Sequence, residues 1–247
     1  MRIREIKAKS VLSKSQVYDY ALNPYVGCQY ACVYCYAKFM KRFTGHTERW
    51  GEFIDIKINA PELLAHEVKK KQVGRVWISG VCDPYQPLEK RYMLTKRCLD
   101  ILIENGWPFT VQTKSSLVLR DIGTLKRSKH AEVGFTITTA DEKMRRIFEQ
   151  GAPPLKKRIE ALAKLHSEGI RTFAMIAPIL PGAEGLVSAL KGKVEYVILD
   201  RLNYHYADWA YKKYGMQWAM EDSFFSQKGE ELNTAFEREG ISCQVVF

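Results

Sequence analysis

Residues 133–179, VGFTITTADEKMRRIFEQGAPPLKKRIEALAKLHSEGIRTFAMIAPI, decide the fold class. The stretch begins with an apolar run, residues 133–138, and ends with a second one, residues 170–179. Between them a helix is predicted to start at Pro153 and Pro154 and to end at Gly169. Its apolar side chains recur at the spacing of one helical face: Leu155, Ile159, Leu162 and Leu165. The order strand, helix, strand predicts a parallel βαβ unit.

A shorter helix is predicted inside the same stretch. Thr139 is followed three positions later by Glu142, which is the capping-box pattern. The pattern predicts that Thr139 is the N-cap of this helix.

The same alternation continues on both sides of this unit. Adding a first strand just before Cys28, about six strand–helix units follow one another. That number favours a closed or partial (β/α)6 TIM-like barrel over an open Rossmann sheet, although periodicity alone leaves both open. The pattern of the C-terminal residues predicts a capping helix followed by a short strand. The other predicted strands are 75–79, 108–113 and 194–199, and the other predicted helices are 59–74, 94–104, 116–126 and 221–240.

Length and composition predict one α/β domain over residues 1–247, with a core at about 18–203 and a C-terminal extension at about 204–247. No apolar run approaches the roughly 20 residues of a membrane span, and the N-terminus lacks the apolar centre of a signal peptide. We therefore expect a soluble cytoplasmic protein without membrane contact. The net charge of +10 suits a polyanionic partner, but the basic residues are dispersed and equally fit solvated helix faces.

Three of the six cysteines form a Cys-x3-Cys-x2-Cys cluster: Cys28, Cys32 and Cys35. Three thiolates can hold three irons of a [4Fe–4S] cluster and leave the fourth iron open to a small molecule. A structural zinc site needs four ligands, and His46 is a poor fourth at eleven residues beyond Cys35. A disulfide does not suit an odd cluster in a reducing cytosol. Chance is a poor explanation for three cysteines within eight residues, so the sequence favours an iron–sulfur site.

The spacing Cys-x3-Cys-x-aromatic-Cys, with Tyr34 as the aromatic, resembles the radical S-adenosylmethionine (SAM) superfamily. Later motifs resemble the branch related to spore photoproduct lyase, often labelled "DNA repair photolyase-like", over about residues 21–203. These motifs are DPYQPLE (83–89), TKS (113–115), TTADE (138–142), EQGAP (149–153) and PILPG (178–182). The resemblance implies a partial barrel of the radical SAM type. It also implies a [4Fe–4S] cluster and SAM as cofactors, and a 5′-deoxyadenosyl radical that takes hydrogen from a substrate.

The resemblance also implies which residues bind SAM. Tyr34 and the Tyr36 backbone would lie near the adenine, and Lys114 would face the SAM carboxylate. Thr136 would hydrogen-bond the ribose or carboxylate, with Thr138 as a weaker candidate. Ser79 would lie near the SAM amino group, although the usual Gly-Gly-Glu form is missing there. The alternatives are that Tyr34 and Tyr36 only pack within their loop and that Lys114 is an ordinary surface lysine.

Cys82 is the candidate catalytic residue, because the lyase uses a cysteine in this region to return a hydrogen atom to its product radical. A buried structural cysteine is the alternative. The adjacent Asp83 is predicted to anchor its loop or to cap the segment that begins at Pro84.

Residues 203–218 are rich in aromatics, which could stack on bases or cover the open side of a partial barrel. The near-helical spacing of Tyr204, Ala207 and Tyr211 favours packing. His205 is either a substrate-site acid or base or an ordinary partly buried histidine.

The sequence as a whole indicates a radical SAM enzyme whose substrate stays open, with nucleic acid mildly favoured, and whose reducing partner is a ferredoxin or flavodoxin. The alternatives are an electron-transfer protein and a nucleic-acid-binding protein without SAM chemistry.

Overall fold

An eight-stranded sheet forms the centre of the computed structural model, which describes residues 1–247. The strand order is β11-β10-β9-β8-β7-β6-β3-β2, and every neighbouring pair from β3 to β11 is parallel. Only β2 pairs antiparallel. The strands are β2 (Leu12–Lys14), β3 (Tyr20–Leu22), β6 (Val76–Ile78), β7 (Phe109–Thr113), β8 (Ala131–Thr136), β9 (Arg171–Ile176), β10 (Tyr196–Leu199) and β11 (Ser242–Val245).

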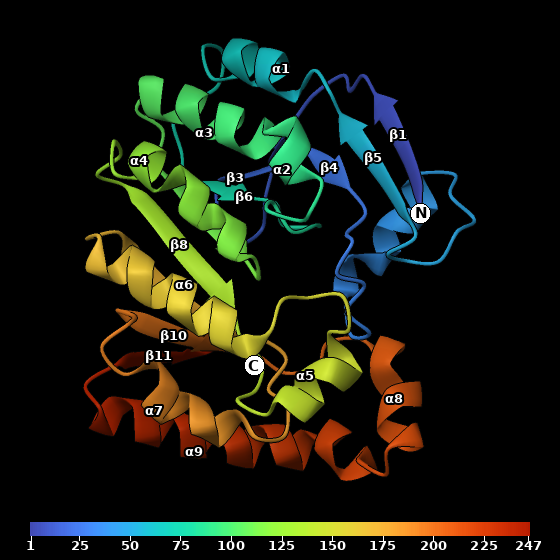
Figure 1. Ribbon diagram of the computed structural model, residues 1–247, viewed down its shortest axis with the longest axis vertical. Helices are drawn as coiled ribbons and strands as arrows, with labels where there is room; N and C mark the ends of the chain where they lie inside the picture. The colour runs from blue at the N-terminus through green and yellow to red at the C-terminus, as the bar shows by residue number, and fades with distance from the viewer.

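Helices follow the parallel strands, so the predicted α/β class and partial (β/α)6 barrel are confirmed. Figure 1 shows α3, α4 and α6 along one side of the sheet, and α9 across the end that carries β10 and β11. The predicted capping helix and short strand are α9 and β11. The α-helices are α1 (Ala60–Glu67), α2 (Glu89–Tyr92), α3 (Leu94–Glu104), α4 (Ile122–Leu125), α5 (Glu142–Phe148), α6 (Leu155–Ser167), α7 (Leu186–Leu190), α8 (Asp208–Lys213) and α9 (Asp222–Arg238).

Two predicted helices are shorter than expected. The first, α1, ends at Glu67, well before Gly74. The stretch 116–126 is a 3-10 helix, η2 (Ser116–Asp121), followed by one turn of α-helix in α4. The other 3-10 helices are η1 (Tyr36–Phe43), η3 (Ala183–Gly185), η4 (His205–Ala207) and η5 (Gln217–Met220).

A second, three-stranded sheet was not predicted. Its order is β1-β5-β4, formed by β1 (Arg2–Ile6), β5 (Phe53–Lys57) and β4 (Tyr25–Val26). The chain leaves the main sheet after Leu22 and enters this small sheet, which stands apart from the main one in Figure 1. The cysteine-bearing segment, residues 27–35, begins directly after β4.

The N-cap predicted for α5 is wrong. The backbone N–H of Lys143 donates to the Asp141 carboxylate at 2.7 Å, so Asp141 is the cap. Thr139 instead donates its hydroxyl to the Pro181 carbonyl at 2.7 Å and accepts from the Asp141 N–H. The capping-box pattern misplaced the helix start because a second capping residue, Asp141, stands immediately before Glu142.

The main hydrophobic core lies between the large sheet and the helices α1, α3, α6, α7 and α9. All six residues of β8 are buried, as expected for a central strand of a parallel sheet. A separate buried cluster joins the cysteine-bearing segment to α5 and α8, where Phe148 packs on Tyr211. No helix combines the length and the apolar character needed to cross a bilayer.

Candidate functional site

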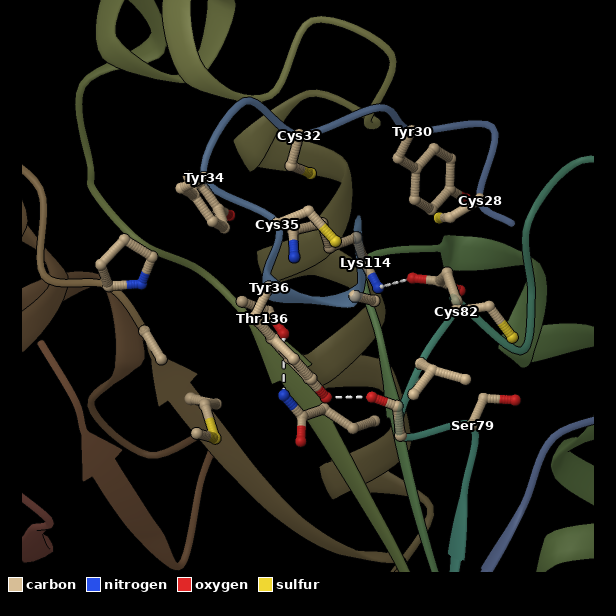
Figure 2. A pocket seen from close by; sticks show the side chains of 18 of the residues that line it. Cys28, Tyr30, Cys32, Tyr34, Cys35, Tyr36, Ser79, Cys82, Lys114 and Thr136 are labelled. Carbon is tan, nitrogen blue, oxygen red and sulfur yellow. Dashed lines mark hydrogen bonds between the residues drawn. The ribbon is translucent and has the colours of Figure 1, made fainter. Parts of the chain in front are cut away.

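One pocket lies at the carboxyl ends of the parallel strands, where a parallel α/β fold places its chemistry (Figure 2). Its wall combines the cysteine-bearing segment with residues that follow β6, β7, β9 and β10, and with the last residue of β8. Nine of the ten residues predicted from the sequence line it: Cys28, Cys32, Tyr34, Cys35, Tyr36, Ser79, Cys82, Lys114 and Thr136. The tenth, Thr138, is completely buried beside the pocket.

A tight turn brings the cysteines to the pocket. Gly27 has φ +89°, and a Cβ there would lie 2.3 Å from the Phe53 carbonyl oxygen, so only glycine fits. The backbone then folds on itself, because the N–H of Cys35 donates to the Cys32 carbonyl at 3.1 Å. The N–H of Val33 donates to the Phe148 carbonyl at 2.9 Å and ties the segment to α5.

Gln86 holds the same segment from the opposite side, a role that sequence reasoning missed. Its side-chain oxygen accepts from the Gln29 N–H at 3.0 Å, and its side-chain amide donates to the Gly27 carbonyl at 3.3 Å. The Gln86 side chain is completely buried. The sequence feature that could have indicated this role is the position of Gln86 within the DPYQPLE motif.

The three thiols point toward one region of the pocket from three positions along the segment (Figure 2). Burial raises the pKa of all three, that of Cys32 to about 12, so an incoming metal must displace protons from them. No three His, Cys, Asp or Glu side chains are close enough to hold a single metal ion. A [4Fe–4S] cluster bonds each thiolate to a different iron, so three thiols that line one pocket fit such a cluster.

Lys114 extends from the end of β7 into the pocket. Its Nζ lies 3.8 Å from Glu149 Oε1 and 5.7 Å from the centre of the Tyr34 ring. Burial alone would lower the pKa of Lys114, but Cys32 and Glu149 outweigh it and raise the pKa above its ordinary value. The amine is therefore a charged group that can attract an anion.

Glu149 forms a buried charge network beneath the cysteine-bearing segment. Arg158 Nη1 lies 2.6 Å from Glu149 Oε2, and the Tyr34 hydroxyl donates to Oε1. The Thr138 hydroxyl also donates to Oε1, at 3.3 Å. Burial would raise the pKa of Glu149, but Arg158 and Lys114 outweigh it and hold the pKa below its ordinary value. Thr138 therefore belongs to this network and not to the pocket wall.

Thr136, Ser79 and Tyr36 are the remaining candidates for SAM binding, and they differ in whether their polar atoms already have hydrogen-bond partners. Thr136 accepts a hydrogen bond from Gln112 at 3.1 Å. Ser79 adopts φ +65°, and its buried hydroxyl has no hydrogen-bond partner. The Tyr36 hydroxyl donates to the Gly80 carbonyl, and the residue as a whole is 40% exposed. Ser79 thus carries an unused hydroxyl at the edge of the pocket.

Cys82 and Asp83 have separate tasks in the loop after β6. The Cys82 thiol lines the pocket and donates to the Tyr25 carbonyl at 3.5 Å. Burial raises its pKa to about 12, so it keeps its proton at neutral pH. Asp83 accepts from the Thr113 hydroxyl at 2.6 Å and from the Lys114 N–H at 2.7 Å. It therefore anchors its loop to the end of β7.

The aromatic stretch 203–218 is partly buried and partly exposed. Ala207 and Tyr211 pack into the buried cluster around the cysteine-bearing segment. Tyr204 and Tyr206 are exposed and stack on each other with ring centres 5.6 Å apart, and Lys38 lies 5.2 Å from the Tyr206 ring. His205 is fully solvent-facing beside Asp208, at 96% side-chain exposure, so it is not a partly buried histidine.

A family model of the radical SAM superfamily matches residues 22–184. An uncharacterized protein of Methanocaldococcus jannaschii is 35% identical over 208 residues, covering 82% of this chain and 78% of that protein. A protein of Pseudomonas phage M6 named radical SAM Nalpha-GlyT isomerase is 26% identical over 162 residues, covering 65% of this chain and 33% of its own length. The chain spans 56% of the related uncharacterized proteins of Mycobacterium and of Acidianus two-tailed virus.

Solved structures share the fold at low sequence identity. Spore photoproduct lyase complexed with dinucleoside spore photoproduct superposes with a TM-score of 0.67 at 16% identity, over 98% of this chain and 81% of that one. SuiB of Streptococcus suis bound to S-adenosylmethionine superposes with a TM-score of 0.61 at 14% identity, over 92% of this chain and 50% of that one.

Proposed function

The chain belongs to the radical SAM superfamily, and from this premise we propose that Cys28, Cys32 and Cys35 hold a [4Fe–4S] cluster that acts on SAM in the pocket at the strand ends. When bound, the cluster and SAM together supply a one-electron cleavage that yields a 5′-deoxyadenosyl radical able to take hydrogen from a substrate. The observation that carries the proposal is the meeting of three thiols, a charged amine and an unpartnered hydroxyl in one pocket.

The other pocket residues have tasks that follow from their chemistry. Lys114 binds the SAM carboxylate through its charge, and Ser79 supplies a hydrogen-bonding group for the SAM amino group. Tyr34, the Tyr36 backbone and Thr136 border the adenosine. The Tyr34 hydroxyl is already bonded to Glu149, so only its ring is free to contact SAM.

We propose Cys82 as the hydrogen donor to a substrate radical. The donor must be a protonated thiol, and burial keeps Cys82 protonated at neutral pH. In this step the S–H bond of Cys82 breaks and a C–H bond forms on the substrate. The thiyl radical left on sulfur returns to the thiol with one electron from a ferredoxin or flavodoxin and one proton from solvent.

The decisive experiment is anaerobic reconstitution with iron and sulfide, followed by addition of SAM and dithionite. We expect 5′-deoxyadenosine and methionine, with none when dithionite is omitted. A protein that carries four irons per chain and yet forms no 5′-deoxyadenosine would instead be an electron-transfer protein or a nucleic-acid-binding protein.

Nucleic acid is the substrate class that we propose. The net charge is +10, and Tyr204 lines the pocket and stacks on Tyr206, which lies beside Lys38. Aromatic faces and cations together suit exposed bases and phosphates. The structural neighbour spore photoproduct lyase, complexed with a dinucleoside spore photoproduct, supports the same class.

Binding of a single-stranded oligonucleotide, measured by fluorescence anisotropy over a series of salt concentrations, tests the substrate class. Affinity should fall steeply with salt, and Lys38→Ala should reduce the slope by about 1 in log–log terms. Lys126→Ala is the matched control, because Lys126 is exposed at the end of α4, outside the pocket, and pairs with Glu168. The absence of binding, or an affinity that does not change with salt concentration, would rule out nucleic acid as the substrate class.

A further inference from the structure

We propose that the indole N–H of Trp50 donates a hydrogen bond to a sulfur of the cluster held by Cys28, Cys32 and Cys35, and so raises the reduction potential of the cluster. The inference rests on the proposed cluster site. It assigns a task to a residue that lies outside the cysteine motif and outside every motif of the resemblance.

The fold places Trp50 beside the three cysteines. Its ring lines the pocket and packs in the same buried cluster as Cys28, Cys32 and Cys35. The next residue, Gly51, has φ +96°, and a Cβ there would lie 2.3 Å from the Ala31 side chain. Phe53 supports the indole edge-on at 5.8 Å between ring centres. The segment that carries Trp50 therefore packs closely against the cysteine-bearing segment.

The Trp50 N–H is buried and has no hydrogen-bond partner. A buried donor left unpaired costs on the order of 1–3 kcal/mol, so its retention calls for an explanation. The sulfurs of Cys28, Cys32 and Cys35 line the same pocket and belong to the same buried cluster as the indole. A sulfur that holds iron accepts hydrogen bonds, so the bound cluster supplies the missing acceptor.

A hydrogen bond to sulfur strengthens as negative charge on the cluster grows. It therefore stabilises the reduced form more than the oxidised form and raises the reduction potential. Trp50→Phe keeps the ring and removes the donor, so we expect its potential to be more negative than that of the unsubstituted protein, at equal iron content. The measurement is a redox titration of the reconstituted protein followed by electron paramagnetic resonance.

Trp77→Phe is the matched control. Trp77 also lines the pocket and also has a buried N–H without a partner, but it lies in β6, outside the buried cluster of the cysteines, and packs against Tyr18. Its potential should equal that of the unsubstituted protein. Equal potentials in Trp50→Phe and the unsubstituted protein would overturn the inference.

A second measurement needs no variant and decides the matter if Trp50→Phe does not fold. Protein labelled with indole-¹⁵N tryptophan is reconstituted and reduced, and its pulsed electron paramagnetic resonance spectrum is searched for a ¹⁵N coupling. We expect one coupled nitrogen. A four-iron cluster without any ¹⁵N coupling overturns the role of Trp50 alone, whereas a failure to assemble the cluster overturns the proposed site itself.

Discussion

Arg158 Nη1 lies 2.6 Å from Glu149 Oε2, and neither side chain has any exposed surface. The pair joins α6 to the residue that follows α5, directly below the cysteine-bearing segment. Arg158 also donates to the carbonyls of Thr136 and Pro153, at 3.1 and 2.9 Å. It thereby balances the Glu149 charge, and the amine of Lys114 stays available on the pocket side.

Glu149→Gln should destabilise the protein strongly, because it leaves the Arg158 charge buried without its partner. We expect the free energy of unfolding to fall by about 3 kcal/mol, measured by urea denaturation. Glu160→Gln on the same helix is the control. Its pairing with Lys156 at 3.9 Å is exposed, so the variant should unfold like the unsubstituted protein. Similar stability of the two variants would refute the structural role of the pair.

The stabilisation by Glu149 should depend on pH. Its pKa is lowered below the ordinary value of 4.5, so the folded state binds the carboxylate proton less readily than the unfolded state. The difference in unfolding free energy between the unsubstituted protein and Glu149→Gln should be constant above that value. It should shrink as the pH falls through the lowered pKa. Urea denaturation over a pH series checks this, and a difference that grows toward acid would contradict it.

Lys114→Met should weaken SAM binding without loss of iron. Removal of a charge-assisted contact worth about 1.5–3 kcal/mol corresponds to a roughly 10- to 100-fold rise in Kd. Calorimetry on the reconstituted protein measures the affinity, and iron analysis measures the cluster. Lys126→Met should change neither quantity. Unchanged affinity in Lys114→Met would show that another group binds the SAM carboxylate.

Cys32→Ala should abolish the four-iron cluster and 5′-deoxyadenosine together. Cys243→Ala is the control, because Cys243 lies in β11, outside the pocket. Iron analysis and product chromatography measure both effects. A Cys32→Ala protein that still cleaves SAM would disprove the ligand assignment.

Cys82→Ala should keep the cluster and should still form 5′-deoxyadenosine in the presence of dithionite, because the thiol is proposed to act after SAM is cleaved. The variant should fail only in the return of hydrogen to the substrate. Loss of iron from Cys82→Ala, judged against Cys243→Ala, would make Cys82 a ligand instead of a donor.

The sequence predicts β6 to β10 because these strands are largely apolar runs separated by periodic helices. It did not predict β2, and the first strand of the main sheet, expected just before Cys28, is β3 at Tyr20–Leu22. The boundaries of α3 were predicted to the residue. The small sheet was not predicted for a physical reason: β1 reads RIREI, in which three of the five residues are charged, and β4 has only two residues. Its pairing is set by contacts between distant segments, which local patterns do not encode.

The charge network of the site was missed for a similar reason. Arg158 sits in the basic run Lys156-Lys157-Arg158, and such a run is ordinarily solvated. One signal was nevertheless present: Arg158 lies three residues after Leu155 and four before Leu162, on the apolar face of α6. A charged residue on a buried face requires a buried partner, although the sequence does not say which one. For Trp50 no local signal exists.

The contacts that hold the cysteine-bearing segment come from far along the chain: Gln86, the Phe148 carbonyl and Glu149. During synthesis, the thiols therefore emerge from the ribosome long before the residues that position them. Arg158 emerges later still, and the charge of Glu149 is balanced only then. We expect iron acquisition to be a late event in biosynthesis. Nascent chains stalled before residue 148 should not retain iron, so cluster delivery is timed by the length of polypeptide already made.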